Sequence, residues 1–248
     1  MKILHLSDLH LEFGEIAPPE TDADVVVLSG DIDIGSKGIE WASQFNRNVV
    51  VILGNHEAYI QKSLEELIVE CREKAAKHPL VHFLENESVV IGDVRFHGST
   101  LWTDFELDKN SVLSMHYARN AMSDFKKITY FGQPFSPEIS AEIHRKSRSW
   151  LFESVKNSRE RKNVVVTHHL PTSEAIQDVF RNSVLNPAFA SNCNEFSELS
   201  EKISLWLYGH NHDCREFIHE GIRYSTNQRG YEGIEMVNGF SLTKTIDF

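Results

Sequence analysis

The chain has 248 residues, of which 41% are hydrophobic and 25% are charged. This balance is typical of a globular protein and excludes wholesale disorder. The 25 lysines and arginines stand against 36 acidic residues, and the resulting net charge of −11 argues against nucleic acid as a partner. A small anionic ligand is not excluded, because a metal site can invert the local field. The longest unbroken apolar run, residues 49–53, is far shorter than the ~20 residues of a membrane-spanning helix, so we expect no membrane partner.

Cysteine usage and the first residues bear on the cellular compartment. Cys71, Cys193 and Cys214 are odd in number and widely spaced, and no CxxC pair occurs. This pattern predicts neither a disulfide framework nor a thiolate zinc site, and it favours free thiols in a reducing cytosol. Residues 1–6 run directly into a strand-like stretch, without a charged segment followed by a long apolar one. We therefore expect no signal peptide and a cytoplasmic location.

The first third of the chain alternates between strand-like and helix-like segments. Short β-branched runs that end in polar or glycine-containing corners predict buried strands at residues 3–7, 25–29 and 49–53. Composition and spacing between them predict helices at residues 38–46 and 63–77. This alternation is typical of βαβ units, so we expect a mainly parallel sheet.

The pattern changes after this first third. Residues 80–99 carry three short strand-like runs in close succession, which we expect to be antiparallel. Residues 100–135 are rich in aromatic side chains and are expected to be irregular, whereas residues 137–157 predict a long helix with a proline near its start. Residues 171–194 predict a loop with short helical pieces. Further strands are predicted at residues 163–167, 205–208, 214–218, 222–225 and from 241 onward.

The domain organisation follows from the absence of any break in this pattern. No internal repeat, low-complexity tract or linker-like stretch occurs, so we expect one domain over residues 1–248. Its two long connections, residues 100–135 and 171–194, are predicted to form cap-like segments beside the site, because long loops near sites often carry specificity.

Histidine, aspartate and asparagine cluster where the predicted strands end. Open α/β sheets bind their ligands at the carboxyl ends of strands, and five such ends in this chain carry oxygen or imidazole donors. The five blocks are Asp8-Leu9-His10, Gly30-Asp31, Gly54-Asn55-His56-Glu57, Thr167-His168-His169 and Gly209-His210-Asn211-His212.

The spacing within these blocks favours a metal site. Asp8 and His10 are two residues apart, as are His210 and His212, and in extended backbone this spacing sends both side chains the same way. Each pair can therefore face one metal ion or straddle two. Neutral imidazole and carboxylate together suit divalent manganese, iron or zinc.

Each block alone is a weak signal, because DxH and HxH occur often by chance. A single histidine is more often a surface residue or a hydrogen-bonded core residue than a ligand. We favour that interpretation for six of the histidines outside the five blocks: His5, His78, His82, His97, His144 and His219. Chance is a poor explanation for donors at five strand ends of one chain.

The order DxH, GD, GNHE, strand-final His and GHxH resembles the calcineurin-like metallophosphoesterases, and the resemblance spans Asp8 to His212. It implies a four-layer α/β/β/α sandwich of two mixed β-sheets flanked by helices, with two metal ions at the strand ends. It also implies a role for each matching residue: Asp8, His10 and His212 would hold one ion, Asn55, His168 and His210 the other, Asp31 would bridge both, and His56 would be the catalytic histidine.

One of these assignments has two candidates. The family usually has a histidine followed closely by proline, and here both His168 and His169 precede Pro171. The end of the strand favours His168 as the ligand, which leaves His169 behind the ligands or facing substrate. If the register slips by one residue, the two roles exchange.

The implied chemistry is hydrolysis of a phosphate ester. Two divalent ions ~3.5–4 Å apart can lower the pKa of a bridging water and present hydroxide at neutral pH, which attacks phosphorus in line with the leaving oxygen. The Asp31 carboxylate would keep the ions close, and His56 is placed to donate a proton to the leaving group. Glu57 or Asp31 would orient the His56 ring, and a surface salt bridge is the alternative role for Glu57.

The two cap-like segments are expected to choose the substrate. Trp102, Tyr117 and Arg119 are candidates for contact with a base or phosphate, although an aromatic residue is more often simply part of the core. Residues 99–105, 121–125 and 185–191 resemble a subgroup of small bacterial and phage members, which fixes no substrate.

Three functions are compatible with these residues. A dinuclear phosphoesterase acting on a small or moderate-sized phosphate mono- or diester leads. A DNA or RNA nuclease of the same superfamily is weaker, because it should bring a basic track that this acidic chain lacks. A metal-free interaction scaffold on the same fold would be expected to have lost ligands, and none is missing here.

Overall fold

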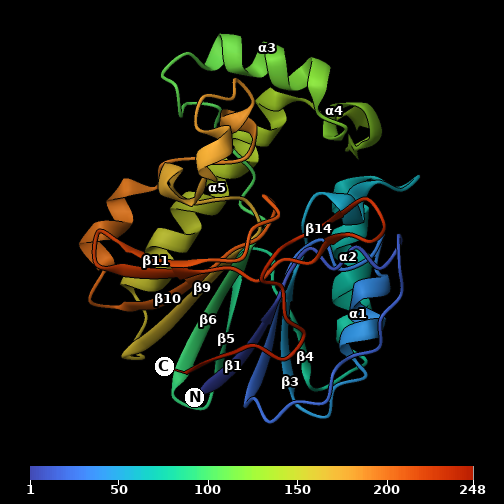
Figure 1. The fold of residues 1–248 in the computed structure, drawn as a ribbon, viewed down its shortest axis with the longest axis vertical. Helices are drawn as coiled ribbons and strands as arrows, with labels where there is room; N and C mark the ends of the chain where they lie inside the picture. The colour runs from blue at the N-terminus through green and yellow to red at the C-terminus, as the bar shows by residue number, and fades with distance from the viewer. Residues whose placement is uncertain (248) are drawn as a thin grey trace.

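The computed structural model describes residues 1–247, which form two facing β-sheets with helices on both outer sides (Figure 1). The expected sandwich of two mixed sheets flanked by helices is therefore confirmed. No helix among these residues is both long and apolar enough to cross a membrane. Cys71, Cys193 and Cys214 are free thiols.

The first sheet has five strands in the order β15-β1-β2-β3-β4. Its strands are β1 (Lys2–Leu6), β2 (Val25–Ser29), β3 (Asn48–Ile52), β4 (Val81–Phe83) and β15 (Thr245–Asp247). β1 to β4 run parallel, as expected for βαβ units, and β15 pairs antiparallel with β1. Helices α1 (Lys37–Ala42) and α2 (Leu64–Ala75) cover its outer face (Figure 1).

The second sheet has six strands in the order β11-β12-β10-β9-β6-β5. Its strands are β5 (Glu87–Ile91), β6 (Val94–Ser99), β9 (Lys162–Thr167), β10 (Ile203–Leu207), β11 (Glu216–His219) and β12 (Ile222–Ser225). β6, β9, β10 and β12 are parallel, and β5 and β11 are antiparallel edge strands. Helix α5 (Pro137–Lys156) packs on its outer face through Leu151 and Val155.

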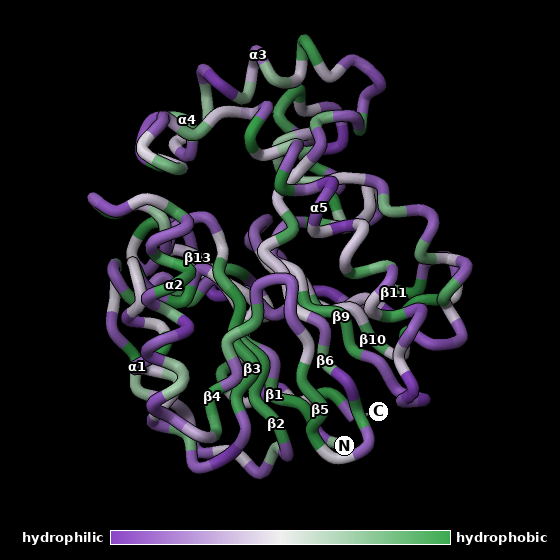
Figure 2. The backbone as a smooth tube through the Cα atoms, turned by 180° about the vertical axis from the view of Figure 1, so that it is seen from behind, coloured by the Kyte–Doolittle hydropathy of each residue, from purple (hydrophilic) through white to green (hydrophobic). Residues whose placement is uncertain are grey.

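The space between the sheets is filled by β-branched and aliphatic side chains. Val25 and Val27 of the first sheet belong to one buried cluster with Val164, Val166 and Leu205 of the second. Figure 2 shows that the strands that meet here are the most continuously hydrophobic part of the backbone. Strands buried on both faces lack polar alternation, which is why they read as unbroken apolar runs.

Two expectations for the middle of the chain are wrong. Residues 80–99 are not three antiparallel strands: β4 pairs in parallel with β3 in the first sheet, and only β5 and β6 pair antiparallel, in the second. The chain crosses from one sheet to the other between Phe83 and Glu87, and side-chain alternation carries no information on which sheet a strand joins.

Residues 100–135 are not irregular throughout, because they contain helices α3 (Ser111–Ala121) and α4 (Asp124–Lys127). Only Ser114 and Ala118 are buried on α3, so the helix has no apolar stripe from which to predict it. Its start is capped by the Asn110 side chain, which accepts the N–H of Leu113.

Four histidines outside the five blocks have hydrogen-bond partners, as expected: His5, His82, His97 and His144. His97 is buried in β6, with its ring nitrogens 2.8 Å from Ser154 Oγ and 3.0 Å from Asn163 Oδ1. Burial lowers the pKa of His97 from 6.5 to about 4.

The low pKa of His97 predicts an acid-sensitive contribution to stability. Between pH 6.5 and 4 the unfolded chain binds this proton and the folded chain does not, so the stabilisation is complete above pH 6.5 and is lost as pH falls. From pH 7 to 5 the free energy of unfolding should fall by about 2 kcal/mol more in the wild type than in His97→Gln. Urea denaturation of both proteins, after metal is removed with a chelator, measures this difference. Equal losses of unfolding free energy in the wild type and in His97→Gln would contradict the prediction.

Candidate metal centre

The five sequence blocks meet at one edge of the sandwich. β1, β2 and β3 end there in the first sheet and β9 and β10 end there in the second. Potential ligand atoms from the loops that follow these strands lie within 4.8 Å of one another in three overlapping groups. The first donor group is Asp8, His10 and His212, the second is Asp31, His168 and His210, and the third joins His10, Asp31 and His56.

The backbone at these loops is in a conformation that side chains rarely adopt. Five of the predicted ligands have left-handed φ angles, which cost on the order of 1–3 kcal/mol each for a residue other than glycine. They are Asp8 (50°), His10 (46°), Asp31 (53°), His210 (79°) and His212 (49°). Five such residues among the seven predicted ligands support a functional role for these loops.

The first donor group holds two imidazole nitrogens against each other. Nε2 of His10 lies 3.2 Å from Nε2 of His212. The opposite nitrogens, Nδ1 of each ring, face the carboxylates of Glu12 at 3.2 Å and Glu235 at 2.9 Å. Because a carboxylate only accepts, each Nδ1 donates its proton to its carboxylate, which leaves the two Nε2 atoms to face each other. These two nitrogens and the Asp8 carboxylate form a donor set that suits a divalent cation.

The second donor group is fully buried and equally rich in acceptors. His168 Nδ1 donates to the Ser29 carbonyl at 2.9 Å, so its Nε2 points at Asp31 Oδ2, 3.4 Å away, and at Asn55 Oδ1, 3.2 Å away. His210 Nε2 is buried and has no hydrogen-bond partner within the described chain. An unpaired buried imidazole nitrogen, in a residue whose ligand atom lies within 4.8 Å of those of Asp31 and His168, fits a metal ligand.

Charge in the second donor group favours a cation. Burial alone would lower the pKa of His168, but the Asp31 carboxylate outweighs it and raises the pKa to about 10. The proton so favoured would sit on Nε2, the atom that faces Asp31, and a divalent cation can replace it there. Burial and the neighbouring His169 and His168 hold the pKa of His210 well below its usual range, which keeps its lone pair available.

Asp31 belongs to both sides of the site. Its Oδ2 lies 3.7 Å from His10 Nε2 and 3.4 Å from His168 Nε2. Its Oδ1 accepts the backbone N–H of His56 at 2.8 Å, which fixes the rotation of the carboxylate. Burial would raise the pKa of Asp31, but His168 and His56 hold it well below the usual range, so the carboxylate is charged.

His56 lies at the accessible rim of the site, between two groups that the sequence did not single out. Its Nδ1 is 3.2 Å from Glu12 Oε1 and its Nε2 is 3.1 Å from the Tyr231 hydroxyl. Burial lowers the pKa of His56, but Asp31 and Glu12 outweigh burial and the pKa is raised. Glu12 continues the two-residue spacing of Asp8 and His10, so the sequence pattern could have predicted it. Tyr231 is far away in the chain, and no sequence pattern links it to this site.

Glu57 does not orient His56 and is not a surface residue. Its buried carboxylate accepts backbone N–H groups from Asp31, Ile32 and Gly54 at 3.1, 2.9 and 2.9 Å. It therefore ties the loop after β2 to the loop after β3.

Asn55 is held by a residue from the first cap-like segment. Its Nδ2 donates to Asp124 Oδ1 at 2.9 Å, and the Tyr59 hydroxyl donates to the same oxygen at 2.7 Å. With its amide nitrogen engaged in this way, Asn55 turns Oδ1 toward His168. Asp124 opens α4, 69 residues after Asn55, so no local pattern links the two.

Trp102, His169 and Arg119, three of the four candidates for substrate contact, are engaged by other parts of the chain, and His169 takes the place behind the ligands that was one of its two expected roles. Trp102 is 3% exposed and packs against Phe135 in the core. His169 is buried, with Nδ1 3.2 Å from the Thr100 carbonyl and its ring behind His210. Arg119 lies on the exposed side of α3 and pairs with Glu138 at 2.6 Å. None of the three is among the side chains that line the cleft described next.

A cleft of about 420 Å³ opens beside the donor groups. Asp31, His56 and His210 form part of its wall, and residues 121–123 and 170–189 of the two cap-like segments supply much of the rest. The cleft therefore joins the candidate metal centre to both long connections.

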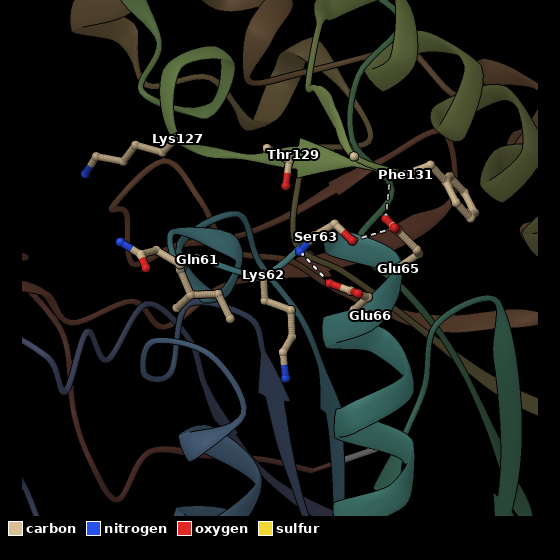
Figure 3. A pocket seen from close by; sticks show the side chains of 10 residues that line it. Gln61, Lys62, Ser63, Glu65, Glu66, Lys127, Thr129 and Phe131 are labelled. Atoms are coloured by element: carbon tan, nitrogen blue, oxygen red, sulfur yellow. Dashed lines mark hydrogen bonds between the residues drawn. The ribbon is translucent and has the colours of Figure 1, made fainter.

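A separate cavity of about 690 Å³ lies between the start of α2 and the hairpin of β7 (Thr129–Tyr130) and β8 (Gln133–Pro134) (Figure 3). Glu65 and Glu66 lie in the first turn of α2. Glu65 accepts the backbone N–H of Phe131, and Glu66 accepts the backbone N–H of Ser63. The donor groups contribute no side chain to this cavity.

The chain matches the family of calcineurin-like phosphoesterases over residues 1–214. It therefore belongs to this family, which confirms the resemblance carried by the five blocks. Membership makes the chain a metal-dependent hydrolase that acts on phosphate esters.

Two relatives span nearly the whole chain. The uncharacterized protein L509 of Acanthamoeba polyphaga mimivirus is 26% identical over 265 residues, which cover 93% of this chain and 92% of that protein. The phosphopantetheinyl hydrolase PptH of Mycobacterium tuberculosis superposes with a TM-score of 0.73 at 15% identity, over 93% of this chain and 89% of its own. At that identity the structural likeness shows the shared fold alone.

The position of Glu57 predicts a large loss of stability when its carboxylate is removed. Glu57→Ala leaves three buried N–H groups without an acceptor and should lower the free energy of unfolding by about 3 kcal/mol or more. Glu57→Gln keeps one acceptor oxygen and should lose less. Urea denaturation of the chelated proteins tests this order, and a loss below 1 kcal/mol (on the scale of a single ordinary hydrogen bond) in Glu57→Ala would contradict it.

Proposed function

We propose that the chain is a dinuclear phosphoesterase that hydrolyses a phosphate mono- or diester. The observation that carries this proposal is the position of Asp31, whose Oδ2 faces a histidine from each donor group. A carboxylate in that position suits two cations better than one, because it offsets part of their mutual repulsion. Imidazole and carboxylate donors together suit manganese, iron or zinc.

Seven side chains would hold the ions. The first ion would take Asp8, His10 and His212, the second would take Asn55, His168 and His210, and Asp31 would contact both. When bound, the ions would polarise the phosphoryl oxygens and lower the pKa of a water molecule that attacks phosphorus. Glu12 and Glu235 hold the outer nitrogens of His10 and His212 and so orient the rings.

His56 would donate the proton to the leaving oxygen. Its pKa is raised by Asp31 and Glu12, which favours the protonated form of the ring, and His56 lines the cleft with its Nε2 3.1 Å from the Tyr231 hydroxyl. Glu12 would hold Nδ1 throughout, because its contacts with His10 and His56 outweigh burial and lower its pKa to about 2. An ionised Glu12 keeps the donated proton on the nitrogen that faces substrate.

The size of the cleft and the charge of the chain support a small or moderate-sized substrate. A volume of about 420 Å³ is in the range of small-molecule sites. A net charge of −11 argues against a nucleic acid as the substrate.

The bridging role of Asp31 predicts a loss of both metal and activity. The wild type should bind two manganese ions per chain and hydrolyse 4-nitrophenyl phosphate or bis(4-nitrophenyl) phosphate after chelation and manganese addition. Asp31→Ala and His210→Ala should lower turnover at least 1,000-fold, an effect on the order expected when charge stabilisation is removed. Metal analysis and steady-state assays measure both. Full turnover in Asp31→Ala would refute the proposal.

The acid role of His56 predicts that chemistry slows while metal stays. His56→Ala should retain two ions and lose about 100- to 10,000-fold in kcat on a substrate with a poor leaving group, such as phenyl phosphate. The loss should be smaller on 4-nitrophenyl phosphate, whose leaving group needs no proton. Equal losses on both substrates would argue against proton donation.

The two adjacent histidines predict opposite metal contents. His168→Ala removes the ring that faces Asp31, and the variant should lose one metal ion. His169→Ala removes a ring that is hydrogen-bonded to the Thr100 carbonyl, and the variant should keep both ions. Metal analysis of the two purified variants is sufficient. If His169→Ala loses an ion and His168→Ala does not, the assignment of the two histidines is reversed.

A further inference from the structure

The part of the cleft beyond His56 is apolar. Its side chains come from the two long connections, or directly precede the second, rather than from the loops that supply the donors. They are Met122, Leu170, Ile176, Phe180, Leu185 and Phe189. Phe180 is 53% exposed, so a large hydrophobic ring faces solvent at this wall. An exposed apolar surface beside polar catalytic groups is typical of a ligand-binding wall.

Positive charge is missing from the same wall. Among the residues that the structure describes, no lysine or arginine lines the cleft, and Glu235 adds a negative charge. Two arginines on these segments are engaged elsewhere: Arg119 pairs with Glu138 and Arg181 pairs with Asp178.

Lys127 is not among the side chains that line the cleft. It lines the other cavity, as Figure 3 shows, and its Nζ lies 4.5 Å from the ring centroid of Tyr59, which does line the cleft. A second phosphate or carboxylate on a substrate would therefore meet no lysine or arginine in the cleft wall beyond His56.

Three of the four amide side chains in the cleft are engaged with backbone carbonyls, and the fourth, Asn55, is engaged with Asp124. Gln177 Nε2 donates to the carbonyls of Asn211 and His212 at 3.0 and 2.8 Å. Asn186 Nδ2 donates to the Phe180 carbonyl at 2.7 Å, and Asn211 Nδ2 donates to the Ala175 carbonyl at 2.9 Å. These groups shape the wall and offer few N–H donors to a further anion.

We propose that this wall binds an uncharged, largely apolar leaving group, and that the enzyme discriminates against phosphate esters whose leaving group carries a second anion. The phosphate would lie at the donor groups, with its ester oxygen toward His56, and the rest of the molecule would extend along Phe180 and Leu185. This inference rests on the proposed function and names the substrate class that the site selects.

The test compares two aryl monoesters that differ in one charge. 2-Naphthyl phosphate and its 6-sulfonate derivative have leaving groups of nearly equal acidity, so the chemical step should be similar for both. With the manganese-loaded full chain, kcat/KM should be at least tenfold lower for the sulfonated ester, mainly through KM. Equal or faster turnover of the sulfonated ester would overturn the inference.

A pair of variants tests the position of the wall. Phe180→Lys places a cation in the cleft. The ratio of kcat/KM for 2-naphthyl phosphate to kcat/KM for its sulfonated derivative should fall at least fivefold in this variant. Val179→Lys adds the same charge at the adjacent residue, which is 80% exposed and does not line the cleft, and it should leave the ratio unchanged. If Phe180→Lys leaves the ratio unchanged, or both variants change it equally, the leaving group does not bind at this wall.

Failure of this inference is distinguishable from failure of the proposed function. Hydrolysis of both esters at the same metal-dependent rate refutes only the leaving-group preference. If manganese produces no hydrolysis of either ester, the proposed function falls and the preference falls with it.

Discussion

The structure of the site depends on one buried carboxylate, that of Asp31. Its two oxygens have different tasks: Oδ1 accepts the backbone N–H of His56, and Oδ2 lies between His10 from the first sheet and His168 from the second. The left-handed backbone at Asp31 and the hydrogen bond from its N–H to Glu57 hold the carboxylate at the junction of the two sheets. A negative charge fixed there in a dry environment is stable only beside positive charge, whether protons on histidines or metal ions.

The sheets and the long connections contribute different parts of the cleft. The strand ends supply donors whose chemistry suits any phosphate ester, since they recognise the group that all such substrates share. The connections supply the apolar wall of the cleft, where Phe180 and Leu185 lie, and this is the part that the rest of the substrate would meet. Asp124 links the two regions, because a residue from the first connection fixes the amide of Asn55.

Much of this arrangement follows from local sequence patterns, and the remainder depends on long-range contacts. The five blocks were predictable because strand ends, two-residue spacing and glycine corners are local signals, and parallel strands bring their carboxyl ends to one edge. Glu12 extended the same spacing and was within reach of the same reasoning. Tyr231 and Asp124 were not, since each meets the site through folding of a distant segment. Helix α3 was missed because it buries almost no apolar surface, and the pairing of β4 was missed because register does not specify the sheet.

The central claim is that two metal ions share the carboxylate of Asp31. Electron paramagnetic resonance of the protein titrated with manganese tests this claim most directly, because two ions joined by a carboxylate are magnetically coupled. The account predicts a coupled, multi-line dinuclear spectrum that saturates at two equivalents of manganese per chain. An uncoupled spectrum of isolated ions, or saturation at a single equivalent, would contradict it.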